Sequence, residues 1–158
     1  MGASGSGKTT VGTLLAQELE VPFVDSDALH PLANVEKMAS GVRLNDEDRW
    51  PWLRAVGSAL ADADQGLVVA CSALKRSYRD AIRAEGPDAI FVYLDGSREL
   101  FADRLSKREN HFMPPSLLDS QLESLEPLRD DEKGIAMNVL DAPYVIAGEA
   151  ASAIRAMR

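Results

Sequence analysis

The first nine residues constrain this chain more than any other segment. They read MGASGSGKT, and Gly2 to Thr9 follow the pattern G-x-x-x-x-G-K-[ST] of a phosphate-binding loop. Glycine permits the backbone angles and close approaches that let successive N–H groups point at phosphate oxygens. The next segment, TVGTLLAQELE, places apolar residues at helical spacing. We therefore predict a nucleoside-triphosphate site in which the amino end of a helix faces the phosphates.

The residue types of this loop have separate roles in holding ATP. Lys8 brings a mobile positive charge to the outer phosphates, and Thr9 offers a hydroxyl to Mg²⁺. A flexible Gly/Ser-rich terminus is the alternative, and the helical pattern directly after the loop argues against it. We expect the following residues to contact the nucleotide: Gly2, Ala3, Ser4, Gly5, Ser6, Gly7, Lys8, Thr9 and Thr10.

Length and charge narrow the classes of function. The 158 residues suit a single domain over 1–158, and 46% of them are hydrophobic, enough for a packed core. A net charge of −8 without a basic run argues against nucleic acid or a membrane surface as the main partner. The single Cys71 rules out an internal disulfide, which fits a cytoplasmic protein. We expect Cys71 to be a buried small residue and not a catalytic thiol.

Apolar runs alternate with helical patterns along the chain. Strands are predicted at VPFVD, GLVVACSA, AIFVYLDG and IAMNVLDA, and helices at about 34–64, 75–86, 98–107 and 149–157. Unbroken apolar strands between helices are typical of a parallel sheet that is covered on both faces. We predict an α/β fold of three layers. The mixed stretch SKRENHFMPPSLLDSQ is either a mobile lid, at about 105–120, or an ordinary helix–helix connection.

Two carboxylates follow the first predicted strand. Carboxyl ends of parallel strands meet the ligand crevice, so we expect Asp25 and Asp27 in VDSDALHP to lie near the phosphates. We assign Asp25 to the metal, and Asp27 to catalysis and acceptor binding, since a carboxylate can accept a proton from an acceptor hydroxyl. A pair of solvated turn aspartates is the alternative. The Asn-Lys-x-Asp element of a switch GTPase does not occur.

Cations in an acidic chain suggest a small anionic acceptor. The segments LNDEDRWPWL and CSALKRSYRD contribute Arg49, Lys75, Arg76 and Arg79, of which Arg76 is better explained by a surface salt bridge. Arg104 and Arg108 are one helical turn apart and can stack on a base or neutralise a transferring phosphoryl group. His30 and His111 could each hydrogen-bond a polyol, although a lone histidine is more often structural.

Four segments together resemble bacterial gluconokinases in order and spacing: GASGSGKTT, DSDALHPLANVEKMASGVRLNDEDRWPWL, CSALKRSYRD and HFMPPSLLDSQLESLEP. The resemblance covers essentially the whole chain, and its second and fourth segments are the specific ones. Shikimate kinases share the Asp-x-Asp element but carry a glycine triplet where this chain has CSALK. The resemblance therefore favours gluconate over shikimate as the acceptor.

This resemblance implies transfer of the γ-phosphoryl group of ATP to the 6-hydroxyl of D-gluconate. It also implies a nucleoside-monophosphate-kinase-like fold with a moving lid, usually in a homodimer. By family analogy, Arg104 lies against adenine and Arg108 acts near the transferred phosphoryl. Arg49, Lys75 and Arg79 are candidates for the acceptor's carboxylate. Ser26 between the aspartates and Thr9 in the loop depart from the family's usual glycine and serine without removing a needed group.

The position of the loop raises one further expectation. A phosphate-binding loop is delivered by a strand, and only Met1 precedes Gly2. We expect an apolar central strand of about five to ten residues before Met1. Two other functions stay open on the sequence: a different small-molecule kinase, such as a shikimate-kinase-like enzyme, and a non-catalytic nucleotide-binding regulator.

Overall fold

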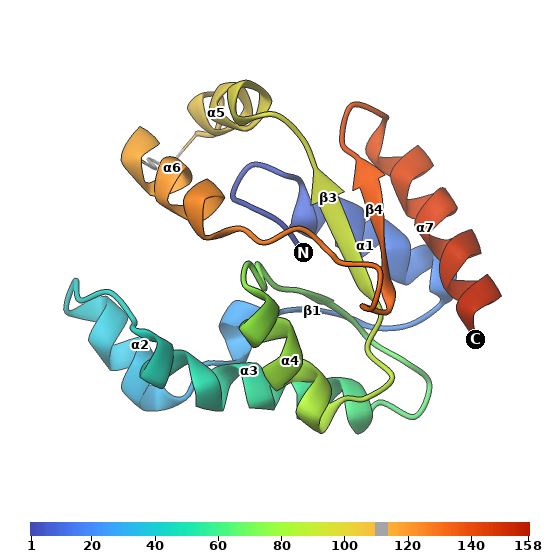
Figure 1. The fold of residues 1–158 in the computed structure, drawn as a ribbon, viewed down its shortest axis with the longest axis horizontal. Helices are drawn as coiled ribbons and strands as arrows, with labels where there is room; N and C mark the ends of the chain where they lie inside the picture. Colours follow the sequence, from blue (N-terminus) through green and yellow to red (C-terminus); the bar gives the residue numbers. More distant parts are fainter. Residues whose placement is uncertain (110–113) are drawn as a thin grey trace.

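Parallel strands and helices alternate along the chain (Figure 1). The computed structural model describes residues 1–109 and 114–158. β1 pairs with β2, Phe23 opposite Val68, and β3 pairs with β4, Phe91 opposite Gly134; both pairings are parallel. The elements are α1 (Lys8–Leu19), β1 (Phe23–Asp25), the 3₁₀ turn η1 (Ser26–Leu29), α2 (Leu32–Ala39), α3 (Asp46–Ala61), β2 (Val68–Ala70), α4 (Arg76–Glu85), β3 (Phe91–Asp95), α5 (Arg98–Ser106), α6 (Pro115–Ser124), β4 (Gly134–Asn138) and α7 (Pro143–Met157).

Alternate residues of the strands face two different layers of helices, because successive side chains of a strand point to opposite faces. Val69 and Phe91 pack into a cluster with side chains of α3 and α4. Val68 and Val92 pack against side chains of α1 and α7. Figure 1 shows α3 and α4 on one side of the strands and α1 and α7 on the other. The prediction of a three-layer α/β fold is confirmed.

The start of the chain lies between the two strand pairs. The Leu94 N–H donates to the Met1 carbonyl at 2.9 Å, and the Gly2 N–H donates to the Ser72 carbonyl at 3.2 Å. Among the described residues, β2 and β3 do not pair with each other. A cavity of about 850 Å³ lies along them, lined largely by apolar side chains of α1, β2 and β3. The strand expected before Met1 stays a prediction.

Several predicted boundaries were wrong. The single helical region at 34–64 is divided into α2 and α3, because Asn45 forms a capping box with Asp48 that starts a new helix. α7 begins at Pro143 and not at Glu149, with proline at its first position, where a missing N–H costs nothing. The PPSLLDSQ part of the expected lid forms α6, with Pro115 at its start.

The upper end of the molecule is closed by α5 and α6, beyond the arrowheads of β3 and β4 (Figure 1). Phe101 and Leu105 of α5 and Leu118 of α6 share one buried cluster with Leu94 and with Ala3 of the loop. The first loop of the chain is therefore packed against α5 at the carboxyl ends of the strands, where α/β proteins bind ligands.

Candidate active site

The Gly2–Thr9 loop keeps a shape that only glycine allows at two positions. Gly5 and Gly7 have φ angles of 82° and 94°, in the left-handed region. A Cβ atom on Gly5 would lie 2.8 Å from the Phe101 carbonyl oxygen, so a side chain there would push the loop off α5. Gly7 caps α1 without a side chain, which leaves the amino end of that helix open to a phosphate group.

Two polar side chains of the loop, Ser6 and Lys8, have hydrogen-bonding capacity for a ligand. The Lys8 ammonium donates to the Ala3 carbonyl at 3.0 Å. The buried Ser6 hydroxyl has no hydrogen-bond partner among the described residues. Burial of the Lys8 ammonium, with Arg108 adding repulsion, lowers its pKa to about 8, although Asp25 and Asp27 act in the opposite direction. Within the described part of the chain, the Ser6 hydroxyl is unpartnered and the Lys8 ammonium bonds one carbonyl, and both groups fit a nucleotide phosphate.

Asp25 and Asp27 stand at the end of β1, as expected. The Asp27 N–H donates to Asp25 Oδ1 at 3.0 Å, so Asp25 starts the 3₁₀ turn η1. Both aspartates are exposed. No group of three or more His, Cys, Asp or Glu side chains gathers in the part of the chain that the structure describes. A Mg²⁺ ion here would rest on few protein ligands, such as Asp25 and Thr9, together with phosphate oxygens, which is its usual habit.

The arginines of α5 border the loop. Arg104 Nη1 donates to the carbonyls of Gly5 and Ser6, both at 3.4 Å, and Nη2 donates to the Val139 carbonyl at 2.8 Å. Arg104 therefore supports the loop, and its predicted contact with adenine stays a prediction. Arg108 is exposed near the start of the expected lid. His111 falls outside the described residues.

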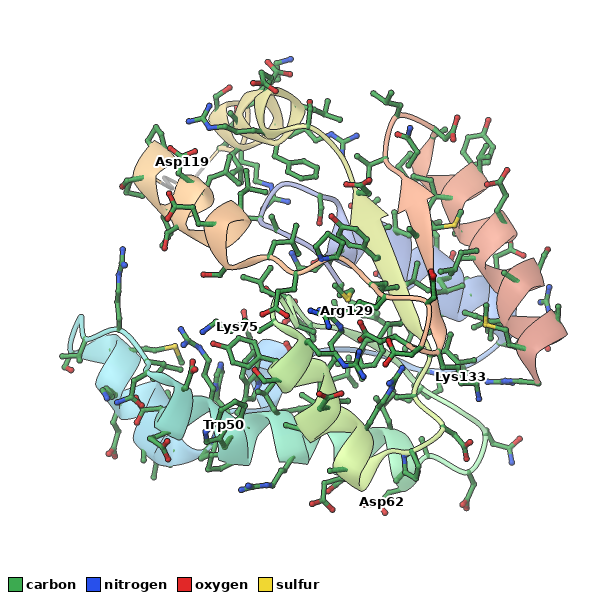
Figure 2. All side chains as sticks on the ribbon, viewed as in Figure 1. Trp50, Asp62, Lys75, Asp119, Arg129 and Lys133 are labelled. Atoms are coloured by element: carbon green, nitrogen blue, oxygen red, sulfur yellow. The ribbon has the colours of Figure 1, made fainter. Side chains whose placement is uncertain are left out.

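Two of the predicted acceptor cations meet at one carboxylate. Arg49 of α3 donates to Asp46 Oδ1 at 3.2 Å, and Lys75, just before α4, donates to Asp46 Oδ2 at 3.4 Å. The Tyr78 hydroxyl also donates to Asp46 Oδ1. Figure 2 shows Lys75 at the start of α4 and Trp50 on α3, and Trp50 packs edge-on against the Tyr78 ring.

His30 lies close to this group. Its ring stacks on Trp52 with 4.3 Å between ring centroids, and the Trp52 indole N–H donates to the Ser26 carbonyl at 2.7 Å. Burial lowers the pKa of His30, with Arg49 adding to the shift and Asp27 opposing it. His30 is therefore held near Asp27 as a half-buried hydrogen-bonding group.

Arg79 does not join the other cations. Its side chain is 0% exposed and pairs with Glu132, Nε to Oε1 at 2.6 Å and Nη2 to Oε2 at 2.9 Å. Its remaining donors bond the carbonyls of Ala73, Leu74 and Pro127. Arg79 has no donor left for an acceptor, so its assignment as a substrate-binding residue is corrected. Arg76 makes surface pairs with Asp80 and Asp131, as expected.

Three neighbours of the site were not identified from the sequence. Asp46 and Tyr78 complete the group around Arg49 and Lys75, and Gln121 of α6 accepts a hydrogen bond from the Ser4 N–H of the loop at 2.8 Å. The spacing of Lys75 and Tyr78, three residues apart at the start of a helix, could have placed them on one face. Nothing in the local pattern around Gln121 points to the loop.

Known proteins resemble this chain over most of its length. A sequence model named "Shikimate kinase" matches residues 4–147. The gluconokinase of Gluconobacter oxydans (strain 621H) is 50% identical over 152 residues, which cover 94% of this chain and 85% of that protein. The chain belongs to the gluconokinase family. The predicted family is confirmed, and the shikimate kinase match reflects the kinase domain type that the two groups share.

Further gluconokinases agree. The thermoresistant gluconokinase of Escherichia coli (strain K12) is 40% identical over 161 residues, which cover 100% of this chain and 91% of that protein. The crystal structure of a gluconokinase from Sinorhizobium meliloti 1021 superimposes with a TM-score of 0.84 at 44% identity, covering 99% of this chain and 90% of that one. Within residues 1–109 and 114–158, every helix is too short or too polar to cross a membrane.

Proposed function

We propose that this member of the gluconokinase family transfers the γ-phosphoryl group of ATP to the 6-hydroxyl of D-gluconate. The products are 6-phospho-D-gluconate and ADP. The observation that carries this proposal is the pairing of a phosphate-binding loop with two half-exposed cations, Arg49 and Lys75, on the neighbouring helices. Gluconate is a polyol with one carboxylate, so it matches a site that combines cations with His30 and Asp27 as hydrogen-bonding groups.

Each side chain near the loop has a proposed task. Lys8 and Arg108 stabilise the negative charge on the phosphoryl group as it moves. Asp27 orients the acceptor hydroxyl and accepts its proton while the hydroxyl oxygen bonds to the γ-phosphorus and the bond to ADP breaks. Thr9 and Asp25 would hold Mg²⁺, which would offset the negative charge of the phosphates.

The acceptor's two ends are recognised by different groups. Arg49 and Lys75 bind the carboxylate, while His30 and His111 bind hydroxyl groups. By family resemblance Arg104 lies against adenine, and it also supports the loop through the Gly5 and Ser6 carbonyls. We also propose that residues 1–158 act as one domain, that the segment at about 105–120 moves as a lid, and that the chain works as a homodimer in the cytoplasm.

A coupled ADP-release assay tests this function. The panel contains gluconate, shikimate, other sugar acids and nucleosides, with and without Mg²⁺. We expect gluconate to give the highest kcat/KM. Lys8→Ala should lower kcat by about a hundredfold or more because it removes charge stabilisation in the transition state. Preferred turnover of another acceptor, or near-normal kcat in Lys8→Ala, would contradict the proposal.

Asp27→Asn separates two versions of the mechanism. Asparagine keeps the shape of the side chain but cannot take a proton, so a general base here predicts a loss of kcat of roughly a hundred- to ten-thousandfold. ATP affinity should change little. An unchanged kcat with a raised KM for gluconate would instead mean that Asp27 only orients the hydroxyl.

A further inference from the structure

One carboxylate joins cations from two helices. Asp46 Oδ1 accepts hydrogen bonds from the Tyr78 hydroxyl at 2.5 Å and from Arg49 Nη1 at 3.2 Å, while Oδ2 accepts from Lys75 Nζ at 3.4 Å. Arg49 and Asp46 belong to α3, and Tyr78 belongs to α4. The positions of the two cations relative to each other therefore depend on Asp46.

We propose that Asp46 is a positioning residue for acceptor binding. It holds Arg49 and Lys75 in one cradle for the acceptor's carboxylate, and Tyr78 fixes the orientation of Asp46. This inference rests on the proposed gluconate site and adds a residue that does not itself touch the substrate.

Asp46 is not needed to start its own helix. The Asn45 side chain accepts from the Asp48 N–H, and Asp48 Oδ2 accepts from the Asn45 N–H, both at 2.9 Å, so the end of α3 is already capped. Tyr78 as a residue is 7% exposed and its ring packs edge-on against Trp50, whereas its hydroxyl donates to Asp46 and accepts from Arg49. The Tyr78 ring therefore contributes to the hydrophobic core, and its hydroxyl holds Asp46 between the two cations.

The cradle keeps charge and donors for a ligand. It contains two cations and one carboxylate, so one positive charge remains. Arg49 and Lys75 side chains are 33% and 34% exposed. Among the described residues, only Nη1 of the Arg49 guanidinium forms hydrogen bonds, although a guanidinium has five N–H donors. A carboxylate can therefore bind Arg49 and Lys75 without displacing Asp46.

The cradle is also directed toward the reaction. The His30 ring stacks on Trp52 with 4.3 Å between ring centroids, which places His30 beside α3, the helix that carries Arg49. The Trp52 indole N–H donates to the Ser26 carbonyl, next to Asp27, and Asn34 Nδ2 donates to the Asp48 carbonyl, so both bonds hold this side of the site to α3. An acceptor with its carboxylate in the cradle can extend past His30 toward Asp27.

Asp46→Asn sets two effects against each other. It raises the charge of the cradle from +1 to +2, which attracts an anion, but it releases two long side chains that binding must then immobilise. We expect the second effect to dominate and the KM for gluconate to rise about 5- to 20-fold. Tyr78→Phe changes no charge and keeps the ring, so we expect a smaller rise of about two- to fivefold in the same direction.

The experiment compares the wild type with Asp46→Asn, Tyr78→Phe and a matched control, Asp80→Asn. Asp80 is a carboxylate of α4 that pairs with Arg76 at 2.9 Å on the surface. For each protein, kcat, both KM values and the melting temperature are measured at low and high salt. The proposal expects a raised KM for gluconate in the first two variants, an unchanged KM for ATP, and no change in the control.

Three results would overturn the proposal. An unchanged or lowered KM for gluconate in Asp46→Asn would mean that Asp46 only neutralises the cations. An equal loss of affinity for ATP and gluconate, together with a lowered melting temperature, would assign it a purely structural role. If the wild type did not phosphorylate gluconate at all, the proposed function would fall as well, whereas wild-type turnover with unaffected variants removes this inference alone.

Discussion

Two cations at the start of α4 have different roles. Arg79, inside the helix, is 0% exposed and its donors are taken up by Glu132 and three carbonyls. Lys75, just before the helix, joins Arg49 at Asp46, and both of these cations are about one-third exposed. A buried cation with a full set of partners can only support the fold. A half-exposed pair with one carboxylate between them can still bind an anion.

Breaking the buried pair should have the largest effect on stability. Glu132→Gln leaves the Arg79 charge buried without its partner, which typically lowers the free energy of unfolding by about 3–5 kcal/mol. For a domain of this size, the melting temperature should fall by roughly 6–20 °C. Thermal unfolding followed by circular dichroism measures the change.

The control is a double variant, Arg79→Met with Glu132→Leu, which removes both charges. It should recover part of the loss, because no charge stays buried, but the carbonyls of Ala73, Leu74 and Pro127 lose their donors. The KM for gluconate of folded Glu132→Gln should match the wild type. A raised KM with an unchanged melting temperature would reverse the roles given to Arg79 and to the Arg49–Lys75 pair.

Removing one of the two partly exposed cations should affect substrate binding and not stability. Arg49→Ala removes a charge-assisted contact that contributes about 1.5–3 kcal/mol, so the KM for gluconate should rise roughly ten- to a hundredfold. The melting temperature should change little, because the Arg49–Asp46 pair is half exposed. Discrimination against neutral polyols should weaken as well. If the KM stays the same, Lys75→Ala is the next variant to measure.

Part of the fold and of the candidate site could be predicted from the sequence. The loop of Gly2–Thr9, the strand runs and the Asp25–Asp27 pair follow from local patterns, and Asp25 is the last residue of β1. Lys75 and Arg79 could not be separated, because both are cations in the same short segment. Arg79 is structural because its partner is the buried Glu132, and Glu132 lies 53 residues later in the sequence. Long-range pairing of this kind leaves no local pattern.

The same limit explains the missed helix boundaries and contacts. The break between α2 and α3 depends on a reciprocal cap between Asn45 and Asp48, a signal weaker than the apolar periodicity on either side. Gln121 meets the loop because α5 and α6 fold over it through buried Phe101 and Leu118. The mixed composition of SKRENHFMPPSLLDSQ indicated a lid or a helix–helix connection, so the helix α6 within it was missed.

A third cation, Lys8, can be tested by changing the pH, because its ammonium group titrates near neutral pH. Its pKa is lowered to about 8, chiefly by burial, so it loses its proton just above neutral pH. Phosphate binding favours the protonated form, and ADP affinity should therefore fall about tenfold between pH 7 and pH 9, with proton uptake on binding at the higher pH. Calorimetry in buffers of different ionisation enthalpy measures both quantities. Lys8→Ala should bind weakly at every pH, and the same slope in that variant would assign the titration to another group.

The smallest effect is expected at the exposed end of α4, where Arg76 bonds both oxygens of Asp131 at 3.0 Å. This geometry is as favourable as that of the buried pair, but the Asp131 side chain is 66% exposed and water screens its charge. Asp131→Ala should lower the melting temperature by no more than about 2–4 °C, and less in high salt, with unchanged kinetics. Arg76 also keeps its bond to Asp80, so no charge is left alone. A loss as large as that of Glu132→Gln would show that bidentate geometry, and not burial, is what distinguishes the structural pairs of this helix.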